Sequence, residues 1–449
     1  MRGVRPAVKD RAGRIIGKAR ESMPEGTFAV GTGLIIAAAT AYLFVITAHA
    51  GLDKTQYAAF GAFWGFIFVA GPGLMLPLEQ EVGRALAHRK AQGIGGGPLV
   101  QRAARLGALL TAGMVAIVLV TAPLYVGGQF HDNWLLVVAL AVGLVGFYAM
   151  HTTRGTLSGN GRFRPYGEML AVDGIAKLLG AIVLLIIGVN NAGAYGMCMA
   201  LSPFVAVAFS LRRPKGLLTP GPPAPYSELS NALFLLLGGS ILMQALGYSP
   251  LLGVNFLKQP GDTAAVAAFT SAFFVARIPP LLFQAVQGTL LPKLAGLAGA
   301  GRHDDFRTGL RQLTLIVAGI AVLGTVLAYL IGVPVGEKLF PPFDIPRGDL
   351  ALLAAGMGVF IIALTIAQAL LALRGYWAAL WSWLAGIVVF AIVAKLITDL
   401  ELRVELGFLL GAAVSTGLMA ITLAARMRRG VPESIEPLIT QLEHEPIEL

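Results

Sequence analysis

Stretches of about twenty apolar residues recur along the chain, and short polar or charged segments separate them. A helix needs about 20 predominantly apolar residues to cross the hydrocarbon core of a bilayer, so each stretch predicts one membrane-spanning helix. The pattern predicts an all-α polytopic membrane protein with about twelve such helices. Their predicted bounds are 27–50, 58–78, 103–125, 134–153, 169–187 and 192–211 in the first half, and 232–256, 264–287, 313–333, 350–373, 377–396 and 405–425 in the second.

The charges of the loops predict how these helices are oriented. With the N-terminus in the cytoplasm, 26 lysines and arginines fall in cytoplasmic segments and 6 in outer segments, while Lys177 and Arg277 remain within the membrane. This excess agrees with the rule that positively charged loops stay inside. The sequence therefore predicts a multi-pass protein of the inner (cytoplasmic) membrane with both termini in the cytoplasm.

A proline- and glycine-rich segment, 212–226, divides the chain near its midpoint and is typical of a semi-extended linker. Leu-Pro dipeptides end the second and eighth spans at Pro77 and Pro292, and Arg-Gly dipeptides follow the fourth and tenth at Arg154 and Arg374. Six spans per half predict two six-helix lobes of like orientation, related by a pseudo-twofold axis along the membrane normal. The predicted division is a basic cytoplasmic N-terminus (1–26), an N-lobe (27–211), a cytoplasmic linker (212–231), a C-lobe (232–426) and a cytoplasmic tail (427–449).

Composition narrows the class of protein further. The chain is 56% hydrophobic and 13% charged with a mean hydropathy of +0.75, which excludes a soluble protein of this size. Orientation accounts for the net charge of +10, so nucleic acid is not an expected partner. The histidines lack metal-ligand spacing and no P-loop is present, so we expect no metal, no cofactor and no built-in ATPase. Energy is then expected from a proton or sodium gradient, the membrane potential or consumption of the product.

The eighth predicted span carries one full charge, Arg277, well inside an apolar segment. An arginine there costs a few kcal/mol unless it faces water, a partner or a ligand. Thr270, Arg277 and Gln284 are spaced by seven and share one face of a helix. Two interpretations remain open: the arginine pairs with a neighbouring helix, or this face lines a polar cavity between the lobes, where a parallel repeat of this kind places its substrate site.

Other polar side chains lie inside the predicted spans. Asp173 and Lys177 are one helical turn apart in the fifth span, where they either form an intrahelical ion pair or face a cavity. Tyr42, Gln244 and Tyr248 add polar groups to the first and seventh spans beyond what lipid-facing helices require. Small residues in the first span also predict close helix packing.

The sign of the buried charge points to the chemistry of the ligand. Lys177 and Arg277 are opposed by one carboxylate, Asp173, well inside a span, so the predicted cavity is cationic. A pump for organic cations needs buried carboxylates instead. A cationic cavity suits phosphate or diphosphate, which arginine binds through two hydrogen bonds at once.

Two runs of sequence resemble a known family. The loop and fifth helix of Wzx-type polysaccharide flippases resemble RGTLSGNGRFRPYGEMLAVDGIAKLLG (154–180). The eighth helix of those proteins and of the related lipid II flippase resembles ARIPPLLFQAVQGTLLPKLAGLA (276–298). All belong to the multidrug/oligosaccharidyl-lipid/polysaccharide exporter (MOP) superfamily. The extra pair of helices that forms a lipid groove in lipid II flippases is not found among the predicted spans, which favours the polysaccharide branch.

The resemblance implies two six-helix lobes around a central cavity that alternates between inward- and outward-open states. It implies a substrate of glycan attached to polyprenyl phosphate or diphosphate. By position, it assigns Arg277 to the family's cavity arginine. It assigns Arg154, Asp173 and Lys177 to the charged positions around the fifth helix.

We therefore expect a flippase, and not an enzyme, that moves a polyprenyl-linked oligosaccharide or cell-wall glycan precursor from the inner to the outer leaflet. The expected cavity residues are Arg277, Lys177, Gln284, Arg154, Tyr42, Gln244 and Tyr248, and Asp173 is the ion-coupling candidate. Expected partners are the lipid-linked glycan, membrane lipids, and polymerases or glycosyltransferases. The alternatives are a multidrug or cation antiporter of the same superfamily, a membrane glycan polymerase or transferase, which the short outer loops disfavour, and a passive scaffold.

Overall fold

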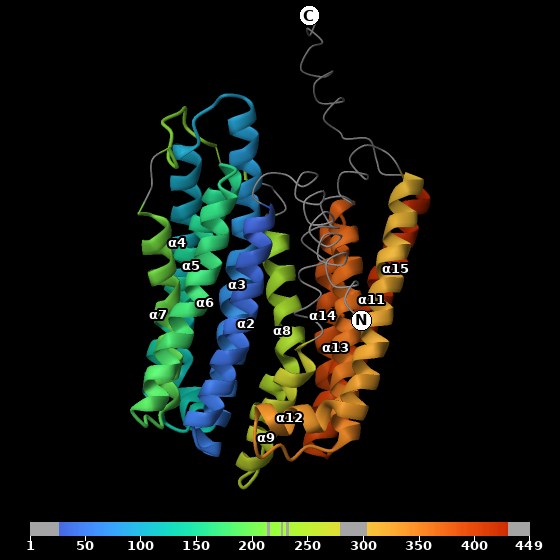
Figure 1. Ribbon diagram of the computed structural model, residues 1–449. Coiled ribbons are helices and arrows are strands. Elements are labelled where there is room, and N and C mark those ends of the chain that lie inside the picture. The colour runs from blue at the N-terminus through green and yellow to red at the C-terminus, as the bar shows by residue number, and fades with distance from the viewer. Residues whose placement is uncertain (1–26, 213–215, 226–227, 230–232, 279–302, 430–449) are drawn as a thin grey trace, which may run out of the picture.

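The computed structural model describes residues 27–212, 216–225, 228–229, 233–278 and 303–429, and all regular structure within these ranges is helical (Figure 1). Eleven of the described helices are long and apolar enough to cross a membrane. The prediction of an all-α, multi-pass membrane protein is therefore confirmed. The N-lobe consists of α2 (Thr27–Gly51), α3 (Lys54–Ala91), α4 (Gly97–Phe130), α5 (Trp134–Gly159), α6 (Phe163–Ile186) and α7 (Ala192–Ser210). The described helices of the C-lobe are α8 (Leu233–Leu257), α9 (Thr263–Ala276), α11 (His303–Leu327), the π-helical turn η2 (Ala328–Gly332), α12 (Val333–Leu339), α13 (Arg347–Ala372), α14 (Tyr376–Leu396) and α15 (Leu400–Arg429).

Some helix ends differ from the predicted ones. Helices α3 and α4 have 38 and 34 residues and extend beyond the predicted 58–78 and 103–125 at the end of the bundle where they meet (Figure 1). We call this the linker end, and the opposite end the short-loop end. The predicted span 264–287 begins as α9, which has only 14 described residues, and its remainder lies outside the described residues.

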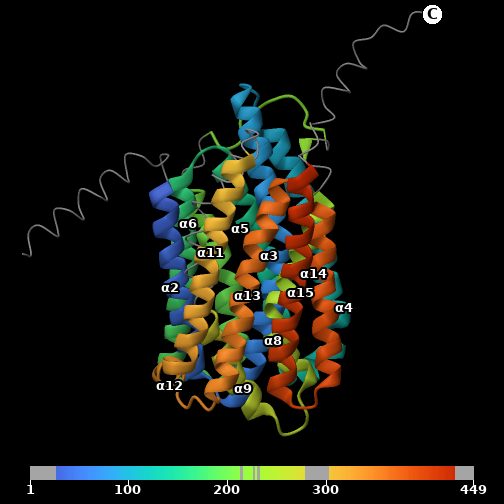
Figure 2. The same cartoon turned by 90° about the vertical axis from the view of Figure 1, so that its right-hand side faces the viewer.

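The helices pack as two similar lobes that lie side by side (Figure 1). The axes of the long helices are nearly aligned with one another (Figure 2). The packed pairs α2–α6, α3–α5, α4–α5, α5–α7 and α6–α7 have the counterparts α8–α14, α9–α13, α11–α13, α13–α15 and α14–α15. This correspondence is what a parallel six-helix repeat requires. The Arg-Gly dipeptides do not match, however: Arg154 lies inside α5, whereas Arg374 follows α13 with a φ of 57°.

Close helix approach depends on glycine, as the small residues of the first span predict. A Cβ atom on Gly33 of α2 would lie 2.3 Å from the carbonyl oxygen of Gly167 in α6. Because apolar side chains gain little by leaving lipid for protein, membrane helices associate largely through such close backbone packing. Between the lobes, α8 packs along α3, and a Cβ on Gly73 would lie 3.3 Å from the Cα of Ile241.

The linker between the lobes is clamped to the N-lobe by one arginine. We call its described residues, 216–225 and 228–229, the linker strap. The Arg89 guanidinium, only 5% exposed, donates to both carboxylate oxygens of Glu228 at 2.6 and 2.7 Å. It also donates to the carbonyl oxygens of Gly95, Pro222 and Pro223 at 2.9, 3.1 and 3.2 Å. All five N–H donors of the arginine are thereby used, and the strap is fixed to the N-lobe.

Replacing Arg89 with methionine is expected to release the strap while the helices stay folded. Hydrogen bonds to charged groups contribute roughly 1.5–3 kcal/mol each, so local opening is expected to become at least about tenfold more frequent. Chymotrypsin cleavage after Leu218, which is 56% exposed, measures this opening. Arg164→Met, which removes an exposed arginine, is the matched control. Equal cleavage of Arg89→Met and the wild-type protein would mean that the clamp does not hold the strap.

The same clamp is expected to weaken in acid. Hydrogen bonds from Arg89 hold the pKa of the Glu228 carboxyl below its ordinary value of 4.5. A carboxyl group whose folded pKa is lowered stabilises the structure above its unfolded pKa, and this contribution is lost as the pH falls through the folded pKa. Strap opening, followed by an acid-active protease, is therefore expected to rise below the pH at which an unperturbed carboxyl titrates. In Glu228→Gln this pH dependence is expected to disappear.

Candidate functional site

Arg277 lies at the end of α9, where the lobes meet. The helix ends at Ala276, as expected just before two prolines, and Arg277 is its C-cap. Its guanidinium carbon lies 3.9 Å from the ring centroid of Tyr248 in α8 and 5.3 Å from that of Phe273. One guanidinium nitrogen donates to the carbonyl oxygen of Gly247 at 3.3 Å. The aromatic faces stabilise the half-buried positive charge.

The N-lobe supplies the other side of this arrangement. The Tyr42 hydroxyl of α2 donates to the carbonyl oxygen of Phe274 at 2.9 Å, and the Gln244 side chain of α8 donates to the carbonyl oxygen of Phe68 in α3 at 3.1 Å. The rings of Phe68 and Tyr248 stack with centroids 5.6 Å apart. The structure thus brings Arg277, Tyr42, Gln244 and Tyr248 of the predicted set together across the lobe boundary. We call these four residues the interlobe site. Gln284 lies outside the described residues.

The interlobe site is cationic. None of the ion pairs between described residues includes Arg277, so within the described part of the chain it is not paired with a carboxylate of a neighbouring helix. Among the described residues its guanidinium donates one hydrogen bond, to a carbonyl oxygen, and the other N–H donors have no partner there that would exclude a ligand. A guanidinium backed by aromatic rings is suited to an anionic group such as phosphate.

Lys177 has a different environment from the one expected of a phosphate ligand. Its ammonium group lies 2.6 Å from the carboxylate of Asp173, and both side chains are 12% exposed. The hydroxyl of Ser202 in α7 donates to the other carboxylate oxygen at 2.7 Å. Of the two interpretations left open by the sequence, the intrahelical ion pair is therefore the observed one. The structure brings Lys177 together with Asp173 and Ser202, not with Arg277.

Arg154 belongs to a buried polar network that the sequence did not predict. The Glu79 carboxylate of α3 lies 2.6 Å from His151 Nδ1 and 3.2 Å from the Arg154 guanidinium, both on α5. The hydroxyl of Tyr166 in α6 donates to Glu79 at 3.0 Å and accepts from Arg154 at 2.7 Å. We call these four residues the N-lobe network. Arg154 is thus engaged inside the N-lobe and is not in contact with the interlobe site.

One sequence prediction concealed the N-lobe network, and one residue spacing could have indicated part of it. The second span was predicted to end at Leu78, which placed Glu79 in a loop, whereas α3 continues to Ala91 and keeps this carboxylate inside the bundle. His151 and Arg154 are three residues apart and share one helix face.

Within the described part of the chain, the Nε2 atom of His151 and the Nε atom of Arg154 are buried without a hydrogen-bond partner. The described residues include no group of three or more metal-ligating side chains placed to hold a metal ion.

Comparisons with known proteins bear on the fold. No family model matches the sequence. The uncharacterized protein Rv1510 of Mycobacterium tuberculosis is 28% identical over 438 residues, covering 93% of this chain and 97% of the relative. A second uncharacterized protein of that organism, Rv3630, is 26% identical over 412 residues, covering 88% of this chain and 91% of the relative.

Solved structures match over nearly the whole chain. An inward-facing multidrug resistance MATE family transporter of the MOP superfamily matches with a TM-score of 0.66 and 16% identity, covering 89% of this chain and 96% of the transporter. An outward-facing multidrug resistance MATE family transporter matches with a TM-score of 0.65 and 14% identity, covering 90% of this chain and 97% of the transporter. A mutant of the Vibrio cholerae MATE transporter VcmN matches with a TM-score of 0.62 and 17% identity, covering 91% of this chain and 99% of the transporter. The chain therefore has the two-lobed fold of MATE transporters.

Proposed function

We propose that the protein is a flippase that moves a polyprenyl-phosphate- or diphosphate-linked glycan across the membrane by alternating access. The observation that carries this proposal is the interlobe site, where Arg277 lies against Tyr248 at the boundary of two like lobes. In this fold, rocking of the two lobes changes which side of the membrane has access to the boundary between them. An anionic head group bound by Arg277 would be carried with it. A flippase with this substrate class would belong to the polysaccharide (Wzx-type) branch of the MOP superfamily.

The proposal includes the membrane in which the protein lies and its orientation in that membrane. The excess of lysine and arginine in the segments at the linker end supports a cytoplasmic position for that end, and with it cytoplasmic termini in the inner membrane. The substrate would then be collected from the inner leaflet, where glycosyltransferases make it, and delivered to a polymerase or transferase outside. Transport would be coupled to a proton or sodium gradient or to the membrane potential, with Asp173 as the candidate coupling residue.

A multidrug antiporter is the second candidate, and the solved transporters of this fold favour it because two of those compared above are multidrug resistance proteins. Its substrates are often cations, which need a free carboxylate. Here the buried carboxylates Glu79 and Asp173 lie against Arg154 and Lys177. A third buried carboxylate, Glu405 of α15, has an oxygen without a hydrogen-bond partner among the described residues, but it is not part of the interlobe site, which presents a cation. The charge of the interlobe site therefore supports an anionic substrate there.

Reconstitution tests the proposed function directly. Purified protein is placed in vesicles with a fluorescent polyprenyl-diphosphate-linked oligosaccharide, and a membrane-impermeant quencher reports which leaflet holds the label. Faster transfer of the label than in protein-free vesicles is the expected result. The same vesicles loaded with a cationic dye test the antiporter. Dye transport without movement of the lipid-linked sugar would contradict the flippase.

Alternating access has its own test at the short-loop end, where the lobes are in contact. The ring of His49 in α2 meets that of Phe340, which follows α12, edge-on with centroids 5.4 Å apart. In a Cys198→Ser background, a short crosslinker between His49→Cys and Phe340→Cys is expected to stop transport until it is reduced. The control pair His49→Cys and Tyr57→Cys, both in the N-lobe with ring centroids 4.8 Å apart, is expected to crosslink without this loss. Undiminished transport with the interlobe crosslink would exclude separation of the lobes at this end.

A further inference from the structure

A buried carboxyl group of the C-lobe has no partner within the described part of the chain. Glu405 of α15 is only 1% exposed, and Val404 and Phe408 on the same helix are fully buried. The Oε2 atom of Glu405 is buried without a hydrogen-bond partner among the described residues, and none of the ion pairs between them includes this side chain. The proposed function does not use Glu405.

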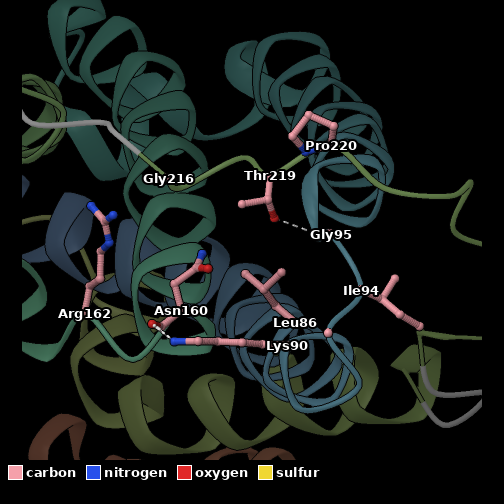
Figure 3. Close-up of a pocket in the computed structure, with 11 residues that line it drawn as sticks. Leu86, Lys90, Ile94, Gly95, Asn160, Arg162, Gly216, Thr219 and Pro220 are labelled. Atoms are coloured by element: carbon pink, nitrogen blue, oxygen red, sulfur yellow. Dashed lines mark hydrogen bonds between the residues drawn. The ribbon is translucent and has the colours of Figure 1, made fainter.

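Two other charged side chains show what is missing at Glu405. Lys90, in the wall of a cavity at the linker end, donates to the carbonyl oxygen of Asn160 at 2.7 Å (Figure 3). The buried carboxylate of Glu79 accepts a hydrogen bond from the Tyr166 hydroxyl at 3.0 Å. Each of these charges is stabilised by a polar group beside it, whereas the described residues supply no such group to Glu405.

An ionised carboxylate is unstable in such a place. Moving a charge from water into an apolar interior costs much free energy unless hydrogen bonds or an opposite charge replace the water. A buried ionisable group without them therefore becomes neutral, and a carboxyl group becomes neutral by binding a proton. Burial alone thus favours the acid form of Glu405.

Further carboxyl groups near Glu405 add to this cost. Asp349 of α13, Asp399 in the α14–α15 loop and Glu401 of α15 lie close enough to act on Glu405 electrostatically. Asp262, just before α9, acts on Glu401 in the same way. Negative charges at short range disfavour the ionisation of one another, and such groups titrate together. Glu405 is the most buried of them, so the proton that the group holds most tightly is expected there.

The positively charged side chains at this end of the C-lobe do not compensate the charge. Arg403 donates to the last carbonyl oxygen of α8. Lys258, after α8, lies 3.3 Å from a histidine of the α4–α5 loop. Arg347 at the start of α13 and Lys395 at the end of α14 are exposed. None of the ion pairs between described residues joins one of these cations to Glu405.

We propose that Glu405 is a proton-binding site that holds its proton at neutral pH. One carboxyl group suffices to bind a proton, whereas a metal ion needs several ligands, and the described residues include no group of three that could hold one. Asp399 is exposed, and Asp349 and Glu401 are half-buried. These carboxylates therefore lead from the surface at the short-loop end to Glu405, and their negative charge would attract protons to it.

The charge of Glu405 bears on the position of α8, the helix that carries Tyr248 of the interlobe site. Arg403 binds the end of α8, and Val404 lies 2.9 Å from the position of a Cβ on Gly253. Loss of the proton would place an uncompensated charge next to this contact. The inference does not depend on the proposed function, because proton binding is measured without transport.

Infrared spectroscopy of the full chain in detergent tests the proposal. A protonated carboxyl group has a carbonyl band that is separate from the bands of carboxylates and that shifts in D₂O. At neutral pH, the difference between the spectra of the wild-type protein and E405Q is expected to show one such band. E168Q, which removes an exposed carboxylate, is the matched control, and its difference spectrum is expected to lack the band.

A titration tests the part of the neighbouring carboxylates. In D349N/E401Q two negative charges near Glu405 are removed, so ionisation of Glu405 becomes easier. The pH at which the band disappears is expected to be lower than in the wild type by roughly one unit. The control E168Q/D304N removes two exposed carboxylates at the linker end, and its titration is expected to be unchanged.

Each outcome decides between support and rejection. A band that is lost in E405Q and disappears at lower pH in D349N/E401Q supports the proton site. If E405Q does not elute as a folded protein, the titrations of the wild type and of D349N/E401Q decide alone. The proposal is rejected if E405Q keeps the band of the wild type, or if D349N/E401Q titrates like the wild type.

Discussion

Transport of a lipid-linked glycan is expected to stop when Arg277 is replaced by alanine. Two charge-assisted hydrogen bonds from its guanidinium to a phosphate are worth roughly 1.5–3 kcal/mol each, so the loss is expected to exceed about a hundredfold in rate at limiting substrate. The arginine has no carboxylate partner among the described residues, so its removal leaves none of the described carboxylates without its partner. The protein is therefore expected to remain folded, and its elution and thermal unfolding check this.

Two further variants separate charge from packing. Arg277→Lys keeps the charge but loses the planar donors, so partial transport is expected. Arg311→Ala removes an exposed arginine of α11 and is expected to leave transport unchanged. If Arg277→Ala transports at the wild-type rate, Arg277 is a structural residue that only packs on Tyr248 and Phe273.

A large loss of stability is expected when Glu79 is replaced by glutamine. Its carboxylate lies 3.2 Å from the Arg154 guanidinium, and the side chains of Glu79 and Arg154 are only 7% and 14% exposed. Removing one partner of a buried pair leaves the other charge uncompensated, which typically costs about 3–5 kcal/mol. A clear drop in the thermal unfolding temperature of the detergent-solubilised protein is the expected measurement.

The loss of stability in Glu79→Gln is expected to come from the charge of Arg154, which is left without its partner. The double variant Glu79→Gln with Arg154→Met removes that charge and is expected to recover part of the lost stability. Glu168→Gln breaks an exposed pair with Arg164 and is expected to cost at most about 1 kcal/mol. If Glu79→Gln is no less stable than Glu168→Gln, the N-lobe network does not contribute to folding.

The predicted fold followed from apolar length alone, because a bilayer sets the length of the helices that cross it. Helix ends were less predictable. Charged residues such as Arg89 continue α3 past the hydrocarbon, where hydropathy gives no signal. The structure brings part of the predicted site together, namely Arg277, Tyr42 and Tyr248. Burying polar side chains in the membrane costs free energy, so such residues tend to lie next to one another.

The N-lobe network escaped prediction for a physical reason. Glu79, His151 and Tyr166 come from three different helices, and their contact depends on how these helices are rotated and staggered. Spacing within one sequence does not determine those quantities. The pair Asp173–Lys177 was predictable because both residues lie on one helix, one turn apart.

The tight packing of α3 against α8 has a consequence for any lipid carrier. Leu252 of α8 lies 2.6 Å from the position of a Cβ on Gly65, so the two helices leave no room for an acyl chain on that edge. A polyprenyl tail would remain outside the bundle, dissolved in the bilayer, while only its polar end turned over. Selection among carriers would then depend on the polar end, and shortening the isoprenoid would change affinity far less than removing a phosphate.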